Sequence, residues 1–390
     1  MREHAQRLSG VERTIFAEMS ALAVRTGSVN LGQGFPDEDG PPEVIEAAVA
    51  ALRGGRNQYP PGHGTPELLD AVIAHQERHY GLVLDRSQVV ATTGATEAVA
   101  AALLGLVDPG DEVVVLEPYY DSYVAMIQFA GGVRRPVTLR APDFRLDVDA
   151  LEAAVTDRTR LILLNTPHNP TGTVLTRTEL EAVAAVAIGH DLVVVTDEVY
   201  EHLTFEQEHV PLATLPGMFE RTVTISSAGK TFSLTGWKIG WASGPAELVA
   251  AVEGAKNWLS YSSGAPLQPA VALALDAHDA FHEALALDLR ERRDLLCAGL
   301  EELEMRVHRP AGTYFATTDV SAYGHRDGRA FCEALPAMAG VVAIPSQVFY
   351  DPAPTGRGDE GRHLVRWAFC KRRDVIEEGL RRLREADLRA

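Results

Sequence analysis

The sequence is poor in cysteine and in positive charge. Its 390 residues include three cysteines, Cys297, Cys332 and Cys370, which lie far apart and lack the spacing of metal ligands. We therefore expect buried thiols in a reducing compartment, and no metal site. Lysine and arginine number 36 against 54 aspartates and glutamates, a formal net charge of −18. This excess of negative charge argues against binding to nucleic acid or to anionic membranes.

Long apolar runs and targeting signals are also missing. No run approaches the length of a membrane span, and residues 1–10 are polar and charged, unlike a secretory signal. We therefore expect a cytoplasmic protein. Hydrophobic residues make up 46% and charged residues 23% of the chain, so it can bury a core and is not disordered. The length allows one large domain and a smaller one.

Short apolar runs alternate with helical segments in the first two thirds of the chain. The predicted strands are residues 89–92, 113–116, 161–164, 192–196 and 222–225. Strands that are apolar throughout and separated by helices indicate an α/β fold, with a mainly parallel sheet covered on both faces. A long helix over 281–303 leads to a smaller α+β part, whose strands are expected near 305–317, 341–344 and 363–369.

Polar side chains follow these strands where each one ends. They are Asn165, Asn169, Asp197, Tyr200, Ser227 and Lys230. Loops after parallel strands meet at one edge of the sheet, which is where such folds bind ligands. The sequence therefore predicts a single site that contains these residues.

Lys230 stands among small residues in a turn after strand 222–225. A lysine removed from water has a lowered pKa, and its neutral amine can form a Schiff base with a carbonyl or with pyridoxal phosphate. A solvated surface lysine is the ordinary alternative. A phosphate-binding G-x-x-x-x-G-K-[ST] loop would need glycine where Thr224 stands. Ser227-x-x-Lys230 fits the S-x-x-K of penicillin-binding enzymes, but their S-D-N motif is absent.

A pyridoxal-phosphate site needs four kinds of group. It needs a lysine to hold the cofactor and an acid to pair with the pyridine nitrogen. It also needs donors to the phenolic oxygen and a nest of N–H, hydroxyl and cationic groups for the phosphate. Asp197 would supply the acid, and we expect a neighbouring cation to lower its pKa and keep it ionised.

Four motifs together resemble the class I/II aminotransferases, pyridoxal-phosphate enzymes of fold type I. The motifs are Asn165-x-x-x-Asn169-Pro170-Thr171-Gly172, Asp197-x-x-Tyr200, Ser227-x-x-Lys230 and Gly236-Trp237-Lys238-x-Gly240. Similar segments run from residue 30 to 371. The resemblance implies a large cofactor-binding domain over 41–280 and a small domain over 281–390. An N-terminal arm over 1–40 would pack against the small domain and a dimer partner.

The resemblance also implies roles for single residues around the cofactor. Lys230 would be the Schiff-base lysine and the acid/base, and Asp197 would pair with the pyridine nitrogen. Asn169 and Tyr200 would contact the phenolic oxygen, and Tyr120 would stack on the ring. The phosphate would be held by Ala95, Thr96, Ser227 and Lys238, and by Tyr59 of the neighbouring subunit. The enzyme would then be a homodimer with shared sites.

Substrate contacts follow from the same resemblance. Arg366 would bind the substrate α-carboxylate with its planar fork of donors, assisted by Gly34 and Asn169. Phe16 and Phe349 match apolar pocket positions. Taken singly, each residue has an ordinary structural explanation, such as a helix cap at Asp197 or an ion pair at Arg366. One cofactor explains all of them together.

Other segments narrow the resemblance within the class. Residues 31–37 and 117–123 are similar to the branch of kynurenine, glutamine and methionine aminotransferases. Residues 16–23, 57–62, 259–261 and 264–276 are more similar to actinobacterial N-succinyldiaminopimelate aminotransferases. That similarity implies ping-pong transfer from N-succinyl-L,L-diaminopimelate to 2-oxoglutarate in lysine biosynthesis. A broad-specificity kynurenine-type enzyme and a cysteine-S-conjugate β-lyase remain alternatives. A regulator that only binds the cofactor is a further one, which the acidity of the chain disfavours.

One departure from the kynurenine branch bears on the substrate. Where that branch places an aromatic residue and a histidine from the second subunit, this chain has Ser263 and Gly264. The pocket should therefore have room for a longer substrate side chain. A succinylated substrate carries an additional carboxylate and should require a further cation, for which Arg25 and the loop at His63 are candidates.

Overall fold

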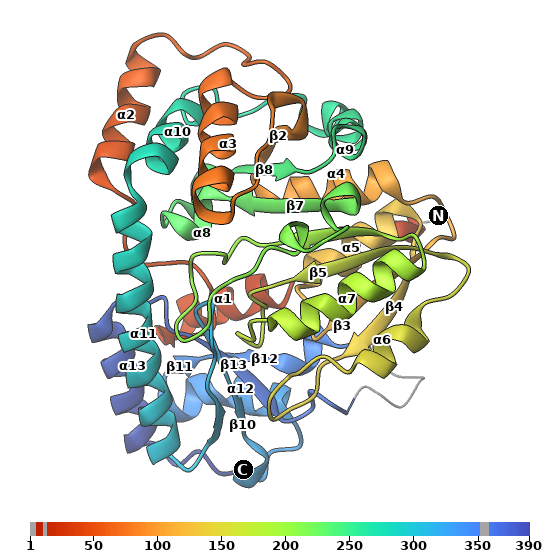
Figure 1. Cartoon of the computed structure of the whole chain (residues 1–390). Helices are drawn as coiled ribbons and strands as arrows, with labels where there is room; N and C mark the ends of the chain where they lie inside the picture. The colour runs from red at the N-terminus through yellow and green to blue at the C-terminus, as the bar shows by residue number, and fades with distance from the viewer. Residues whose placement is uncertain (1–4, 11–13, 352–358) are drawn as a thin grey trace.

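A seven-stranded sheet is the centre of the computed structural model, which describes residues 5–10, 14–351 and 359–390 (Figure 1). In spatial order its strands are β2 (Val89–Thr93), β8 (Ile239–Ser243), β7 (Thr222–Ser227), β6 (Val193–Asp197), β5 (Thr159–Asn165), β3 (Glu112–Glu117) and β4 (Val133–Thr138). Strand β8 runs antiparallel to its neighbours β2 and β7, and the other six strands run parallel to one another. The predicted α/β class with a mainly parallel sheet is confirmed.

Helices cover both faces of this sheet because successive strand residues are apolar on both sides. Val113 and Val115 share a core with α4 (Gly94–Leu106), α5 (Asp121–Ala130) and α9 (Ala246–Leu259). Val114 and Ile162 face the opposite way, toward α6 (Val148–Ala154) and α7 (Arg177–Gly189). A polar residue on either face of these strands would therefore be buried under helices.

A third group of helices packs at the β2–β8 end of the sheet. Its members are α2 (Pro42–Arg53), α3 (Pro66–Tyr80), the one-turn helix α8 (Ala228–Thr231) and α10 (Gln268–Ala277). Pro42 opens α2, and Thr65 caps α3 by accepting a hydrogen bond from the Leu68 N–H at 3.4 Å.

A smaller part of the fold lies at the far end of the long helix α11 (Asp279–Glu302) (Figure 1). Its antiparallel sheet consists of β12 (Ile344–Pro345), β13 (Leu364–Ala368), β10 (Phe315–Asp319) and β9 (Arg306–His308). Helices α12 (Gly328–Ala339) and α13 (Arg373–Glu385) share its core with α1 (Ile15–Thr26). Strand β1 (Val29–Asn30) pairs in parallel with β11 (Val341–Val342), which joins the N-terminal arm to this part.

Short 3₁₀ helices occur in several connections. They are η1 (Gln6–Leu8), η2 (Arg86–Gln88), η3 (Leu212–Thr214), η4 (Phe219–Arg221), η5 (Thr235–Trp237), η6 (Ser321–Tyr323) and η7 (Ser346–Phe349). None of the described helices is long and apolar enough to cross a membrane. The three cysteines are free and buried, as expected.

Three local features differ from the expectations. Strand β4 was not predicted, because Arg134, Arg135 and Pro136 make this edge strand polar. The single strand expected over 305–317 is two strands, β9 and β10, with a connection between them. Lys230 lies in the one-turn helix α8 rather than in a turn. The domain boundaries at 40/41 and 280/281 remain predictions.

Candidate active site

A cavity of about 390 Å³ lies at the carboxyl ends of the parallel strands. The residues predicted for the site that line it are Phe16, Gly34, Ala95, Thr96, Tyr120, Asn165, Asn169, Asp197, Tyr200, Ser227, Lys230, Lys238 and Arg366. Lys238 reaches this edge because it precedes β8, which runs opposite to the other strands. The convergence expected from the strand order is therefore present.

Two predicted residues lie outside the cavity lining. Tyr59 is 82% exposed, in the loop between α2 and α3. Phe349 is buried behind the lining, where its ring stacks on Phe16 with centroids 5.9 Å apart. The candidates for a further cation lie elsewhere too. Arg25 is exposed near the end of α1, and His63 pairs with Glu253 at 3.0 Å.

Lys230 is held at the end of β7 by the short helix α8. Its Nζ donates a hydrogen bond to the Tyr314 hydroxyl at 2.8 Å, and that hydroxyl donates to the Gly34 carbonyl at 2.7 Å. Burial lowers the pKa of Lys230 to about 8. A minor but larger-than-usual fraction of the amine is therefore neutral near physiological pH, and a lowered pKa was expected from the sequence.

Asp197 ends β6 and is also buried. The Tyr123 hydroxyl donates to its Oδ2 at 2.6 Å, and the Val199 N–H donates to its Oδ1 at 3.3 Å. Burial raises the pKa of Asp197 to about 6, although these hydrogen bonds and Lys230 act in the opposite direction. In the protein alone, loss of hydration outweighs these effects, and the lowered pKa expected for Asp197 beside the cation of a bound pyridine ring remains a prediction.

Arg366 lies on β13 and reaches the cavity from the smaller sheet. Its Nη1 donates to Asn169 Oδ1 at 3.0 Å, and its Nη2 donates to the Gly32 carbonyl at 2.9 Å. The guanidinium carbon is 3.9 Å from the ring centroid of Phe315 and 4.9 Å from that of Phe16. Burial lowers the pKa of Arg366 to about 10, so it remains charged at neutral pH. Its Nε is buried with no hydrogen-bond partner among the described residues.

Gly34 is required beside this arginine. A Cβ placed on Gly34 would lie 2.4 Å from the Phe315 ring, which itself packs on the Arg366 guanidinium. A side chain at position 34 would therefore displace the ring that positions the cation. This is a specific reason for glycine in the loop over residues 31–37.

The opposite end of the cavity has the features of an anion site. Helix α4 begins at Gly94 with φ +70°, and the backbone N–H groups of its first turn have no partners within the helix. A Cβ on Gly94 would lie 3.3 Å from Lys238 Nζ, so glycine allows the ammonium to approach the helix start. Ser227 ends β7 at the same cavity. These donors fit a phosphate group.

The donor set as a whole fits pyridoxal phosphate. It provides an anion site at one end, a buried carboxyl at Asp197 and an amine of lowered pKa at Lys230, all lining one cavity. Arg366 adds a buried cation with an unpaired Nε for an acid substrate. Cavities of several hundred Å³ are typical of cofactor and ligand sites.

Two tyrosines of the site were missed in the sequence. Tyr123 donates to Asp197, and it follows Tyr120 by three residues on α5, a helical spacing that could have suggested a shared face. Tyr314 accepts from Lys230 but precedes β10 by one residue. No local pattern marks Tyr314, because it reaches the lysine only through the packing of the two sheets.

The lowered pKa of Lys230 can be measured directly. The chain has four lysines, Lys230, Lys238, Lys256 and Lys371. In cofactor-free protein labelled with ¹³C at the lysine Cε, we expect the Lys230 signal to titrate with a midpoint near pH 8, because burial disfavours its ammonium. Lys230→Ala assigns the signal. A midpoint near the usual pKa of about 10.4 would contradict the burial of its amine.

Comparison with known proteins identifies the family. The model of the class I and II aminotransferases matches residues 26–358. The probable N-succinyldiaminopimelate aminotransferase of Mycobacterium tuberculosis is 56% identical over 385 residues, 97% of either chain. The solved structure of that Mycobacterium tuberculosis enzyme superposes with a TM-score of 0.94 at 55% identity, covering 97% of this chain and 99% of the other. The methionine aminotransferase of Escherichia coli is 40% identical over 375 residues, 95% of either chain. The chain therefore belongs to the class I and II aminotransferases, a family of pyridoxal-phosphate-dependent enzymes.

Proposed function

We propose that this aminotransferase uses pyridoxal phosphate to move the amino group of N-succinyl-L,L-diaminopimelate to 2-oxoglutarate, a step of lysine biosynthesis. The observation that carries the cofactor assignment is the cavity that brings Lys230, Asp197 and Arg366 together. The substrate assignment is supported by the 56% identity to a relative named for this substrate. A cytoplasmic location is part of the same proposal.

Different residues of the cavity would bind different parts of the cofactor. Bound pyridoxal phosphate supplies a carbonyl that takes up the amino group and a ring that accepts the electron pair from the substrate. Asp197 would pair with the ring nitrogen, and the Tyr123 hydrogen bond fixes its carboxyl group. Asn169 and Tyr200 would contact the phenolic oxygen, and Tyr120 would stack on the ring. Ala95, Thr96, Ser227 and Lys238 would hold the phosphate.

Arg366 and Lys230 act on the substrate itself. The Arg366 fork binds the α-carboxylate, and its aromatic neighbours keep water from the cation. Lys230 Nζ takes the proton from the substrate Cα and returns it at the next stage, a task suited to an amine with a pKa of about 8. Each amino acid thus leaves as a 2-oxo acid before the second substrate enters, which is ping-pong kinetics.

The loop at Ser263 and Gly264 offers reduced bulk for the substrate side chain. The resemblance assigns this position to the pocket of the second subunit, where the kynurenine branch has an aromatic residue and a histidine. Gly264 has φ +65°, and a Cβ there would lie 2.2 Å from the Ile239 side chain, so a larger residue would not fit without a shift. Reduced bulk from this loop favours a long substrate such as the succinylated amino acid. Among the described residues that line the cavity, the cations are Lys230, Lys238 and Arg366, so the succinyl carboxylate requires a cation from elsewhere.

A second protomer is the proposed source of groups that the cavity lacks, namely a further phosphate contact and a cation for the succinyl carboxylate. Tyr59 is 82% exposed, and its ring contacts Tyr261 with centroids 5.8 Å apart. Trp258 is 91% exposed at the end of α9, close to this pair in sequence. The loop after α9 also reaches the phosphate end of the cavity, where the Thr93 hydroxyl donates to Ser263 Oγ at 2.9 Å. Exposed aromatics beside an incomplete site support a homodimer in which Tyr59 contacts the partner's phosphate.

A broad-specificity enzyme of the kynurenine, glutamine and methionine type is the alternative. The 40% identity to a methionine aminotransferase and the apolar lining at Phe16 and Phe35 favour it. Elimination from cysteine conjugates would use the same lysine and remains a third activity to test. Release of pyruvate and ammonia from a cysteine conjugate would reveal it.

Half-reactions with single amino acids test the proposed substrate. The holoenzyme is mixed with N-succinyl-L,L-diaminopimelate, glutamate, kynurenine, glutamine or methionine without an oxo acid, and the visible absorbance of the bound cofactor is followed. We expect rapid loss of absorbance with the succinylated compound and with glutamate. Lys230→Ala is the matched control and should lack both this absorbance and turnover. Rapid reaction with kynurenine, glutamine or methionine instead would establish the alternative.

Replacement of Arg366 tests how the α-carboxylate is bound. Arg366→Lys cannot donate two parallel hydrogen bonds, and we expect kcat/KM for each amino acid to fall by about 10- to 100-fold, the worth of one charge-assisted hydrogen bond. The absorbance of the bound cofactor should persist. Arg362→Lys, at an exposed arginine just before β13, is the matched control. A change in kcat/KM of less than about twofold would exclude this role for Arg366.

Complementation tests whether Tyr59 serves the neighbouring site. Tyr59→Ala and Lys230→Ala proteins are mixed under conditions that exchange subunits, and activity is measured against each variant alone. A heterodimer with shared sites regains one intact site, so the mixture should reach about a quarter of the wild-type activity. If Tyr59 served its own protomer, every site would still contain one substitution and the mixture would show no gain.

A further inference from the structure

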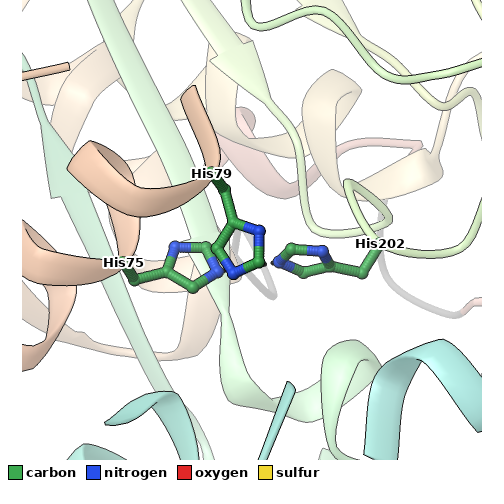
Figure 2. A group of neighbouring side chains, drawn as sticks. All are labelled: His75, His79 and His202. Carbon is green, nitrogen blue, oxygen red and sulfur yellow. Dashed lines mark hydrogen bonds between the residues drawn. The ribbon is translucent and has the colours of Figure 1, made fainter. Parts of the chain in front are cut away.

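Four histidines gather outside the cavity, next to the segment that carries Tyr200. His75 and His79 lie on α3, His202 follows Tyr200 by two residues, and His282 lies on α11. Figure 2 shows the rings of His75, His79 and His202 pointing toward one another from α3 and from the segment after β6. None of the four lines the active-site cavity.

The spacing of the ring nitrogens suits a metal ion. One nitrogen each from His75, His79 and His202 lies within 4.8 Å of the others. His75 Nε2 and His202 Nε2 are 2.8 Å apart. A tetrahedral Zn²⁺ bound at about 2.0–2.1 Å holds its nitrogen ligands about 3.3 Å apart. Small side-chain rotations would therefore place the three nitrogens around one ion.

Several nitrogens of this cluster lack a hydrogen bond. His75 Nδ1, His79 Nε2 and His282 Nε2 are buried without a hydrogen-bond partner among the described residues. Buried polar atoms are normally paired, so three unpaired nitrogens in one place require an explanation. The contact between His75 and His202 satisfies one nitrogen of each ring and leaves His75 Nδ1 without a partner.

A carboxylate also lies beside this cluster. Asp279 lies 3.4 Å from His79 Nε2 and 3.5 Å from His282 Nε2. Arg78 binds both oxygens of Asp279, at 2.9 and 3.0 Å, so this carboxylate is already paired. The three histidines are therefore the better ligand set.

We propose that His75, His79 and His202 bind one first-row transition-metal ion, with Zn²⁺ as the best fit and a water in the fourth position. Three imidazoles are a favoured ligand set for this ion, and His79 and His202 are exposed enough to let it enter. No metal was expected from the spacing of the cysteines, whereas His75 and His79 form an i, i+4 pair on α3 that places two imidazoles on one helix face. The ion would tie α3 to the segment that carries Tyr200, and so stabilise one wall of the active site.

Metal titration of the holoenzyme tests this proposal. Chelator-treated and desalted enzyme is titrated with ZnCl₂ by isothermal titration calorimetry, and its thermal midpoint is measured with and without the ion. We expect one equivalent to bind and to raise the midpoint, because the ion binds the folded state. His79→Gln and His202→Gln should each weaken binding by about 100-fold or more. His190→Gln, at an exposed histidine after α7, is the matched control and should bind as wild type.

Two results of these titrations would overturn the proposed metal site. Wild-type enzyme that binds no zinc, or both variants binding as tightly as His190→Gln, would overturn the site. If the two variants fail to fold, X-ray absorption at the zinc edge of the loaded wild type decides the question. Three imidazole nitrogens at about 2.0 Å would support the proposal, and a shell of oxygen ligands would refute it.

Discussion

The burial of opposite charges in one cavity is the constraint on which the site depends. Lys230 and Asp197 lie at the ends of neighbouring strands, and removal of water moves the pKa of the amine down to about 8 and that of the carboxyl up to about 6. Both shifts bring a group that is normally far from neutrality into the range in which it can exchange a proton. An exposed lysine at the same position would be protonated and unreactive. The covered parallel sheet is therefore a chemical requirement as well as a scaffold.

Such burial persists only where the surrounding structure supplies hydrogen bonds. Tyr123 donates to Asp197, Tyr314 accepts from Lys230, and Asn169 accepts from Arg366. Tyr123 and Asn169 lie in the part of the fold built on the seven-stranded sheet, whereas Tyr314 and Arg366 lie in the part built on the four-stranded sheet. Neither sheet could stabilise these charges alone, because each contributes only part of the donor and acceptor set. The chemistry of the cavity therefore depends on how the two parts of the fold pack together.

The sequence predicted those parts of the site that follow from strand order. Asn165, Asp197 and Lys230 come just after apolar strands, and parallel strands must bring their carboxyl ends together. Tyr314 and the histidines around His202 could not be predicted in this way, since their neighbours are distant in sequence and meet only through tertiary packing. The raised pKa of Asp197 in the protein alone could not be predicted for a related reason: charge neighbours are visible in a motif, but depth of burial is not. Strand β4 escaped prediction because it is polar at a sheet edge.

Substrate choice must be decided at the end of the cavity that motifs do not describe. In the proposed function, Arg366 and Lys230 act on groups that every α-amino acid carries, so they favour no particular side chain. The distinguishing features are then negative ones: the small residues Ser263 and Gly264, and the absence of a fourth cation among the described residues of the lining. Reduced bulk can accept a long substrate, and selection of a charged one would require a cation from outside this lining. This explains how relatives named for methionine and for N-succinyldiaminopimelate can resemble the same chain over almost its whole length. Specificity in such a cavity depends on a few contacts at its open side, where an unpaired substrate charge is costly and a matched one is strongly preferred.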